Sequence, residues 1–267
     1  MTDRFPADLP KIMVAPNGAR RTKADHPALP MTVAETIEAA SAAYEAGAGA
    51  IHAHVRDEAG KHVLDAGLYR ELIAGLGEAV PGMMVQITTE AVGHYTPDQQ
   101  RQLVREVRPF AVSIAVREMI PDSETPEEIE AARVFYDWAL GERIAIQHIL
   151  YSAEDVSRFF RLLRQGVIPG TSHQVLYVLG RYAENQESAP EDLDPFLSVA
   201  AAENSGHNLD WAVCAFGHRE TDCLAHAIRL GGKARIGFEN GLWNRDGALA
   251  RDNADRVKDL MAALADQ

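Results

Sequence analysis

The chain of 267 residues is 46% hydrophobic, which is enough for one large domain or two small ones with a real core. It carries 26 Lys and Arg residues against 39 Asp and Glu residues, a net charge of −13. This negative charge excludes nucleic acid and anionic membranes as expected partners, because both bind positive surfaces. An anionic substrate would need a local cationic centre, either a metal ion or a few focused arginines.

The sequence contains no run of about 18 apolar residues, so we expect no membrane-spanning segment. The first ten residues lack the basic flank and apolar core of a secretory signal. Two cysteines, Cys214 and Cys223, do not form a disulfide framework in a chain of this length. We therefore expect a cytoplasmic protein whose metal site, if present, is built mostly from histidines and carboxylates.

Short apolar runs alternate with longer amphipathic stretches along the whole chain. The runs are continuous rather than strictly alternating, which is typical of parallel strands covered on both faces. The eight expected strands cover residues 11–15, 50–55, 84–88, 110–116, 143–150, 173–179, 211–216 and 234–238.

Helical patterns lie between these strands. Six are distinct, over residues 32–46, 97–107, 126–140, 153–165, 221–230 and 253–264. Thr32 and Glu35 form a candidate capping box, and Pro97 and Pro126 suit a first helical turn. Three glycines, Gly47, Gly166 and Gly231, fall just past helix ends, where a left-handed residue is needed.

Eight strand–helix units in about 250 residues predict a TIM (β/α)8 barrel that forms a single domain over residues 1–267. A doubly wound open sheet is the alternative, but no G-x-G-x-x-G follows the first strand. Residues 181–194 form the longest irregular segment after the sixth strand, where a barrel would use them as a lid or subunit arm.

The sharpest local signal is His52-Ala53-His54 near the end of the second strand. Side chains two apart on a strand face the same way, so both imidazoles would enter the barrel interior. Two polar rings in an apolar interior need a common partner. A divalent metal supplies one, and imidazole ligands favour Zn²⁺.

The last strand ends in Arg235-Ile236-Gly237-Phe238-Glu239-Asn240. This strand borders the first, which borders the second, so Glu239 can reach the same ion as the histidine pair. Two histidines and one glutamate leave positions open for a substrate, as in catalytic zinc sites. Arg235 shares the face of Glu239 and either holds a substrate carboxylate or pairs with Glu239.

Further polar residues end the expected strands and are weak candidates individually. They are Asn17, Thr88, Thr89, Arg117, Glu118, Gln147, His148 and His218. Convergence of such residues at one face is what a barrel active site requires. We expect Cys214 to be a buried apolar residue, and His26, His62, His94, His207 and His226 to lie in loops or on helix surfaces.

With these residues, the chain resembles the β-keto acid cleavage enzymes, a zinc-dependent TIM-barrel family. The resemblance runs from about Ala15 to the last helix. Two motifs carry it: His52-Ala53-His54-Val55-Arg56-Asp57 and Gly231-Gly232-Lys233-Ala234-Arg235-Ile236-Gly237-Phe238-Glu239. Shorter matches are Asn17-Gly18-Ala19 and Gln86-Ile87-Thr88-Thr89.

The resemblance implies that His52, His54 and Glu239 bind Zn²⁺. It further implies that the metal holds a β-keto acid, that an enolate-like carbanion attacks acetyl-CoA, and that retro-Claisen cleavage releases acetoacetate and a new acyl-CoA. Arg235 matches the family's arginine in the last strand, and Thr88 matches the family's hydroxyl after the third. A homo-oligomer, a tetramer in the family, is also implied.

Four places depart from the family pattern, one of them Ile146-Gln147-His148, where the family has a pattern that contains a glutamate. Asn240 stands where the family has an aspartate that helps the arginine in deprotonation, and an amide takes no proton but can orient Arg235. Glu90-Ala91 replaces a Gly-Gly pair, and Arg117 replaces a glycine. We expect Glu118 or His148 to supply the missing base, and Asn17, Thr89 and Arg117 to contact the CoA thioester or substrate.

Three functions follow from these residues. The first is zinc-dependent, CoA-using cleavage of a small β-keto acid. The second is a metal-dependent aldolase or hydrolase that does not use CoA, and the third is a metal-binding barrel that senses a small acid. Exchange of the acetyl group of labelled acetyl-CoA would distinguish the first from the others.

Overall fold

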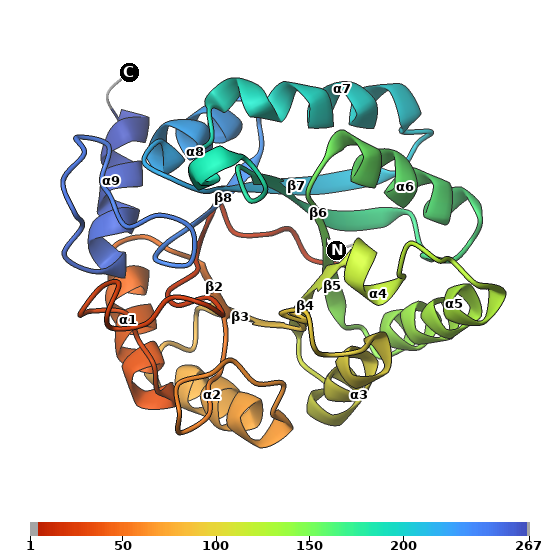
Figure 1. Cartoon of the computed structure of the whole chain (residues 1–267), viewed down its shortest axis with the longest axis horizontal. Coiled ribbons are helices and arrows are strands. Elements are labelled where there is room, and N and C mark those ends of the chain that lie inside the picture. Colours follow the sequence, from red (N-terminus) through yellow and green to blue (C-terminus); the bar gives the residue numbers. More distant parts are fainter. Residues whose placement is uncertain (1–4, 266–267) are drawn as a thin grey trace.

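The computed structural model describes residues 5–265 and contains a closed barrel of eight parallel strands in the order β1 to β8 (Figure 1). This confirms the predicted TIM barrel. The expected single domain stays a prediction, and its residues 1–4 and 266–267 lie outside the described part. The strands are β1 Ile12–Val14, β2 Ala50–Ala53, β3 Met84–Thr88, β4 Ala111–Ala115, β5 Ala145–Leu150, β6 Ser172–Leu179, β7 Asn208–Ala215 and β8 Lys233–Ile236.

The helices form a ring outside the strands (Figure 1). They are α1 Val33–Glu45, α2 Ala66–Ala79, α3 Pro97–Val107, α4 Val116–Met119, α5 Pro126–Gly141, α6 Ala153–Arg164, α7 Asp194–Glu203, α8 Glu220–Arg229 and α9 Asn253–Ala265. Six match the expected helices within one or two residues. The sequence pattern did not identify α2, α4 and α7: three glycines weaken the helical signal of α2, and α4 is a single turn.

The residues predicted to begin and end the helices do so in the structure. The Thr32 hydroxyl accepts the backbone N–H of Glu35, and the Glu35 carboxylate accepts the backbone N–H of Thr32. Pro97 and Pro126 are the first residues of α3 and α5. The glycines after α1, α6 and α8 are left-handed, with φ of 115° at Gly47, 66° at Gly166 and 92° at Gly231.

Two strand boundaries differ from the prediction in ways that matter for the site. Strand β2 ends at Ala53 instead of residue 55, because the chain then leaves the barrel and Arg56 pairs with His62 in an antiparallel bridge. Strand β7 begins at Asn208, three residues earlier than predicted, and pairs with β6 along its full length. His54 therefore lies just beyond the barrel rim.

Side chains of each strand alternate between the barrel interior and the layer beneath the helices. On β1, Met13 belongs to the interior cluster, while Ile12 and Val14 pack against helices. The interior cluster also contains Ile149 of β5 and Leu176 of β6. This alternation decides which polar strand residues reach the site.

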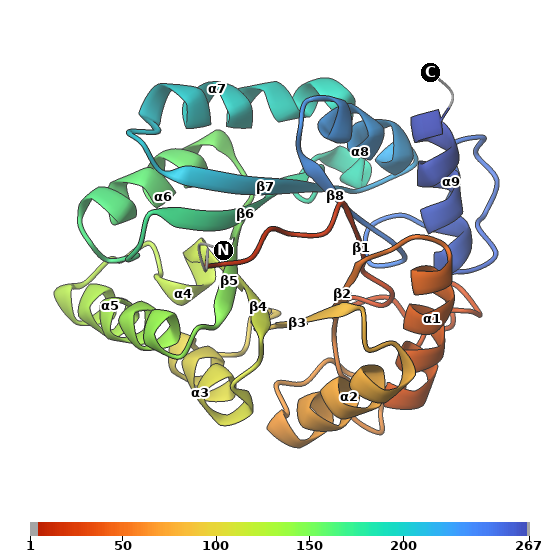
Figure 2. The same ribbon diagram turned by 180° about the vertical axis from the view of Figure 1, so that it is seen from behind.

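The segment before β1 closes the amino-terminal end of the barrel. It crosses that end as an extended chain (Figure 2), and Leu9 packs in the interior cluster. Its backbone is held by Asp210, which accepts the Leu9 N–H at 2.6 Å, and by Gln174, which donates to the Ala7 carbonyl at 2.7 Å. The opposite, carboxyl-terminal end is left for the pocket.

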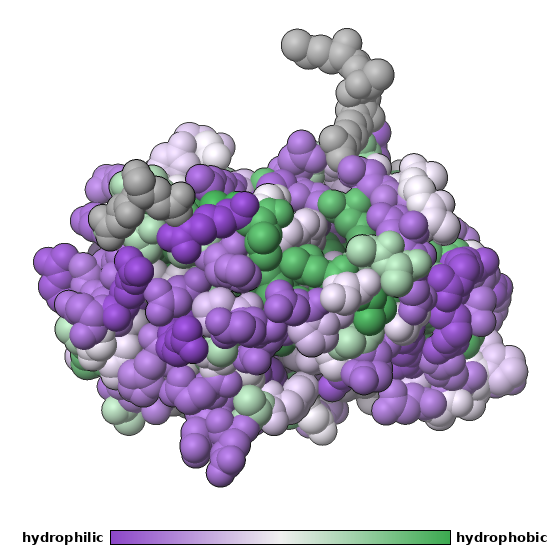
Figure 3. Space-filling view, turned by 90° about the horizontal axis from the view of Figure 1, so that it is seen from above, coloured by the Kyte–Doolittle hydropathy of each residue, from purple (hydrophilic) through white to green (hydrophobic). Residues whose placement is uncertain are grey.

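Hydrophilic side chains cover most of the face seen from above, with an apolar area near its middle (Figure 3). Such areas are typical of contact surfaces, but the expected homo-oligomer stays a prediction. Within residues 5–265, no helix is both long and apolar enough to cross a membrane.

Candidate active site

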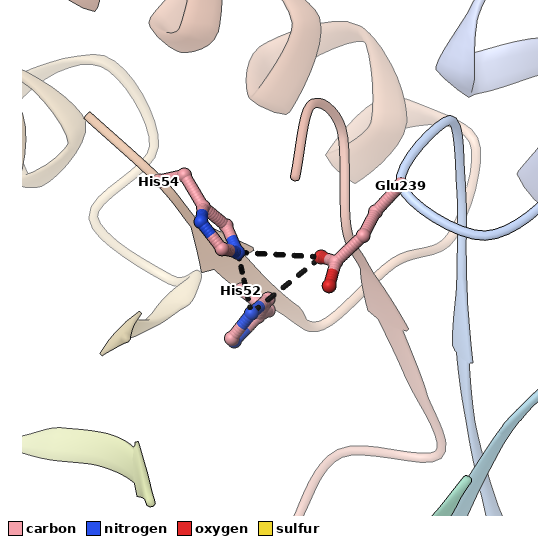
Figure 4. Close-up of side chains that lie close together, drawn as sticks. All are labelled: His52, His54 and Glu239. Carbon is pink, nitrogen blue, oxygen red and sulfur yellow. Dashed lines mark hydrogen bonds and ion pairs between the residues drawn. The ribbon is translucent and has the colours of Figure 1, made fainter. Parts of the chain in front are cut away.

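Three side chains from two strand ends meet at the open end of the barrel (Figure 4). His52 lies on β2, His54 just after it, and Glu239 three residues after β8. The two Nε2 atoms are 3.2 Å apart, and Glu239 Oε2 lies 3.5 Å from His52 Nε2 and 3.6 Å from His54 Nε2. The histidines are 1% exposed. They form the predicted candidate metal site.

These distances suit a tetrahedral zinc ion. Bonds of about 2.0–2.1 Å place neighbouring tetrahedral ligand atoms about 3.3–3.4 Å apart, close to the three observed separations. Glu239 Oε2 is buried and has no hydrogen-bond donor among the described residues. An orphaned carboxylate oxygen that faces two imidazole nitrogens is costly without a cation between them. The residues therefore fit the metal that the resemblance implies.

The ionisation states of the ligands also suit a cation. Burial opposes the charge of Glu239, but Arg235 and the two imidazoles hold the carboxyl pKa well below its usual value. Burial, with the nearby Arg235 charge, lowers the pKa of His52 well below 6.5. The site thus presents a carboxylate and a neutral imidazole, which are the forms that bind metals.

A glutamine on β3 fixes the ring of His52. Gln86 Oε1 lies 2.8 Å from His52 Nδ1, and the Gln86 amide nitrogen donates to Gln147 Oε1 at 3.1 Å. Because Oε1 can only accept, His52 carries its proton on Nδ1 and directs the Nε2 lone pair at Glu239. The amide chain therefore selects the tautomer that a metal needs.

His62 lies beside the second histidine of the site. Its Nδ1 is 3.3 Å from His54 Nδ1, and its Nε2 is 3.1 Å from the Glu90 carbonyl oxygen. The ring is 4% exposed, and burial lowers the pKa of His62 to about 3. His62 lies in a loop, as expected, but its ring contacts a candidate metal ligand, which the sequence did not indicate.

Gly18 and Glu220 hold Glu239 in place. A Cβ on Gly18, whose φ is +61°, would lie 2.7 Å from Glu239 Cγ, so no larger residue fits there without displacing the carboxylate. Glu220 accepts the Gly237 N–H at 3.1 Å and pairs with the fully buried Arg256 at 2.9 Å. The end of β8 is thereby tied to α8 and α9.

Arg56 ties the loops after β1 and β2 together. Its Nη2 donates to the carbonyls of Asn17, Gly18 and Arg21 at 3.3, 2.6 and 2.8 Å. Its Nη1 donates to the Gly60 carbonyl at 2.8 Å. The guanidinium is 7% exposed, and all four acceptors are backbone atoms.

A pocket opens over the three candidate ligands. Arg235 lines it and is 4% exposed. Its Nη2 donates to Glu239 Oε1 at 3.3 Å and to Cys214 Sγ at 3.4 Å. Its Nε and Nη1 have no partner within the described part of the chain. The structure therefore shows the pairing with Glu239, and binding of a substrate carboxylate by Arg235 stays a prediction.

The rest of the pocket wall is charged and aromatic. Arg20 and Arg181 line it with Tyr151 and Glu90. Arg181 lies over the Phe216 ring at 5.2 Å, and its Nη2 is 3.8 Å from Glu90 Oε1. In an acidic chain, these arginines and Arg235 make the pocket locally cationic, as an anionic substrate requires.

Asn17 and Thr88 line the pocket as predicted, but both are already engaged. The Asn17 amide brackets the backbone of His54, donating to its carbonyl at 2.9 Å and accepting its N–H at 3.3 Å. The Thr88 hydroxyl accepts from Ser113 and from the Glu90 N–H. Thr89 does not line the pocket, because its hydroxyl turns away to the Ser113 carbonyl.

Arg117 and Glu118 lie behind the pocket wall, on α4. Arg117 pairs with Asp155 at 2.6 Å and lies over the Tyr151 ring at 4.8 Å. Glu118 accepts the Ala91 N–H and the Gln100 amide, both at 3.0 Å, and burial raises its pKa. Neither lines the pocket, because both side chains are turned into the layer of α3 and α6.

His148 lies on the wrong side of the barrel wall for a catalytic base. Its neighbours on β5, Gln147 and Ile149, face the interior, so His148 faces the helices. Its ring packs against Tyr136 of α5 and Phe159 of α6 at 5.5 and 5.0 Å. Burial lowers the pKa of His148 to about 3. We correct this part of the prediction.

Asn240 does not orient Arg235 as expected. Its side chain is fully buried, and neither amide atom has a partner among the described residues. The hydrogen bonds of Arg235 go to Glu239 and Cys214 instead. The backbone carbonyl of Asn240 accepts from Arg21 at 3.2 Å, which ties this turn to the loop after β1.

Five site residues were not identified as such from the sequence: Arg20, His62, Glu90, Tyr151 and Arg181. A signal for His62 existed, because Asp57 to Gly60 form a tight turn that returns the chain to His54. Tyr151 follows β5 directly and Arg181 follows β6 by two residues, which are positions that a barrel uses for its site. Glu90 was noted only as a departure from the family pattern.

Comparison with known proteins finds relatives over nearly the whole chain. A family model described as "beta-keto acid cleavage enzyme" matches residues 11–267. A 3-keto-5-aminohexanoate cleavage enzyme of Fusobacterium nucleatum is 28% identical, over 92% of this chain and 88% of the relative. A 3-oxoadipate:acetyl-CoA acetyltransferase of Cupriavidus necator is 26% identical, over 96% of this chain and 88% of the relative.

Solved structures share the fold. The ternary complex of ObcA with C4-CoA adduct and oxalate superposes with a TM-score of 0.70 at 15% identity. The superposition covers 90% of this chain and 64% of ObcA. At this identity the similarity supports the barrel alone.

Proposed function

The chain belongs to the beta-keto acid cleavage enzyme family, and from this premise we propose that it cleaves a small β-keto acid with acetyl-CoA in a zinc-dependent reaction. The carbanion of the keto acid attacks the thioester carbonyl, the bond between the keto carbon and the adjacent CH₂ breaks, and CoA moves to the keto acid's acyl group. The products are acetoacetate and a new acyl-CoA, so atoms and charges balance. The observation that carries this proposal is the His52–His54–Glu239 triangle beside the unpartnered nitrogens of Arg235.

The proposed roles follow from the donors that each residue offers. His52, His54 and Glu239 would hold the zinc ion, which when bound supplies Lewis-acid stabilisation for negative charge on the keto oxygen. Arg235 would bind the substrate carboxylate from the pocket wall, while its bond to Glu239 fixes the guanidinium plane. Arg20 and Arg181 attract both anionic reactants to the pocket.

The proposal does not assign the general base to Glu118 or His148, since neither lines the pocket. Thr88 contributes a hydroxyl at the pocket wall. The Asn240 amide cannot accept a proton as an aspartate carboxylate can. Deprotonation of the keto acid in this chain therefore differs from the family pattern. The identity of the keto acid depends on the wall formed by Glu90, Tyr151 and Arg181.

The test is acyl exchange with labelled acetyl-CoA and a panel of short β-keto acids. Mass spectrometry should detect labelled acetoacetate and the new acyl-CoA in equal amounts, and the signal should disappear after chelation and return with zinc. A Glu239→Gln variant is the matched control, since it keeps size but loses the ligand charge. Turnover without CoA, or tight acid binding without turnover, would overturn the proposal in favour of an aldolase or a sensor.

A further inference from the structure

His62 contacts a candidate metal ligand but is not one itself. It lies in the return arm of the turn after β2, and its ring centroid is 4.8 Å from that of His54. It does not belong to the group of side chains whose ligand atoms converge, which contains His52, His54 and Glu239. Its function must therefore act through His54.

The two contacts of His62 determine where the protons lie. Its Nε2 faces the Glu90 carbonyl oxygen at 3.1 Å, and a carbonyl can only accept, so this nitrogen carries a proton. In the neutral ring, Nδ1 is then an acceptor. Among the described residues, His54 Nδ1 lies 3.3 Å from this nitrogen and can donate to it, so His54 then carries its own proton on Nδ1.

We propose that His62 is a positioning residue that accepts the Nδ1–H of His54 and thereby directs the His54 Nε2 lone pair toward the zinc site. This inference rests on the metal site of the proposed function. His54 then has the same Nδ1–H tautomer as His52. The acceptor is His62 Nδ1 for His54 and Gln86 Oε1 for His52.

The residues that support both histidines, Gln86 and Glu90, lie on β3 or just after it. Gln86 lies on β3 itself, and Glu90 follows it by two residues. The Glu90 N–H donates to the Thr88 hydroxyl at 3.2 Å, which fixes the peptide whose neighbouring carbonyl receives His62. His52 is thus oriented directly from β3, and His54 through His62, which Glu90 after β3 contacts.

The carboxylate of Glu90 is a poorer partner for His54 than His62 is. Its Oε2 lies 3.8 Å from His54 Nδ1, beyond hydrogen-bond distance, whereas His62 Nδ1 lies at 3.3 Å. A neutral imidazole orients its neighbour without the added basicity that a carboxylate gives a metal-bound histidine. His62 therefore orients the His54 ring without raising the basicity of its Nε2.

The experiment measures zinc affinity by chelator competition, starting from the zinc-loaded full chain. His62→Leu removes the acceptor, whereas His62→Asn keeps an amide oxygen near the position of Nδ1. We expect His62→Leu to weaken zinc binding about 10- to 100-fold, the usual cost of losing such a partner, and His62→Asn to recover most of it. His173→Leu is the matched control, because His173 is also 4% exposed but lies on the outer side of the barrel.

Each result decides the inference. Equal zinc affinity in His62→Leu and wild type, or equal losses in His62→Leu and His62→Asn, would overturn it while leaving the metal site intact. The same loss in His173→Leu would assign the effect to general destabilisation and would also overturn it. A wild-type chain that binds no zinc would overturn both this inference and the metal site of the proposed function.

Discussion

Two groups of buried histidines lie on opposite sides of the same barrel wall. In the inner group, His52 and His54 face the Glu239 carboxylate and His62 contacts His54, and each ring has a defined partner. The outer group, His148 and His173, lies between β5, β6 and the helices, and each ring has a nitrogen without a partner among the described residues. Burial alone therefore does not make a histidine functional; its partners and the face of the strand do.

The largest expected difference between the groups is metal binding. His54→Ala should lose at least 1,000-fold in zinc affinity and turnover, because two ligands hold zinc far less tightly than three. His148→Ala should retain wild-type zinc content, since its ring faces α5 and α6. Elemental analysis of the two purified variants measures their zinc content. Equal loss of zinc in both variants would contradict the difference between the two groups.

The inner face also supplies the cation for the substrate. Arg235→Gln should lower kcat/KM about 100-fold, because a charged hydrogen-bonding partner of the substrate contributes about 1.5–3 kcal/mol. Zinc content should stay unchanged. Steady-state kinetics with the best keto acid measures kcat/KM. Arg235→Lys is the control, because it keeps the positive charge but loses the planar guanidinium group. An unchanged kcat/KM would remove Arg235 from substrate binding.

The outer group should contribute to the acid sensitivity of the fold. Burial lowers the pKa of His148 from 6.5 to about 3, so between these values the unfolded chain binds a proton that the folded chain does not. The stability that this histidine contributes is thus fully present above pH 6.5 and falls as the pH falls, by about 1.4 kcal/mol per pH unit. Urea unfolding at pH 6.5, 5.5 and 4.5 should show a shallower pH dependence in His148→Leu, and parallel curves would contradict this.

The smallest expected effect is at neutral pH. His148→Leu should raise the free energy of unfolding by about 1 kcal/mol, because it removes a buried nitrogen that lacks a partner. Turnover should match wild type. Urea unfolding and kinetics at pH 7 measure both quantities. Loss of turnover with intact stability would instead restore His148 as a candidate base and would sharpen the question of how it reaches the pocket.

The sequence predicts the barrel and the metal triad well because both depend on local, periodic signals. The spacing of His52 and His54 fixes a shared face, and Glu239 follows the strand that closes the barrel. The same periodicity holds for His148, but its strand is apolar on both faces. Nothing in the run from Ala145 to Leu150 identifies which side is the interior.

The supporting residues were harder to predict because their contacts depend on loop geometry. His62 reaches His54 only because the chain turns back at Gly60, and Glu90 reaches His62 through a carbonyl that carries no side-chain signal. Asn240 looked like a partner for Arg235 from its position, yet backbone direction after Gly237 takes its amide elsewhere. Contacts to main-chain atoms leave little trace in the identity of residues.

Arg56 has a consequence for how such a site can diversify. Its guanidinium binds only peptide carbonyls, from two separate loops, and so makes no demand on the side chains that those loops carry. Substitutions around the pocket mouth can then accumulate without loosening the frame that holds His54 and Gly18. In evolutionary terms, the residues that anchor the loops differ from the residues that select the substrate. The substrate acid can therefore change through substitutions in the loops while the metal ligands keep their positions.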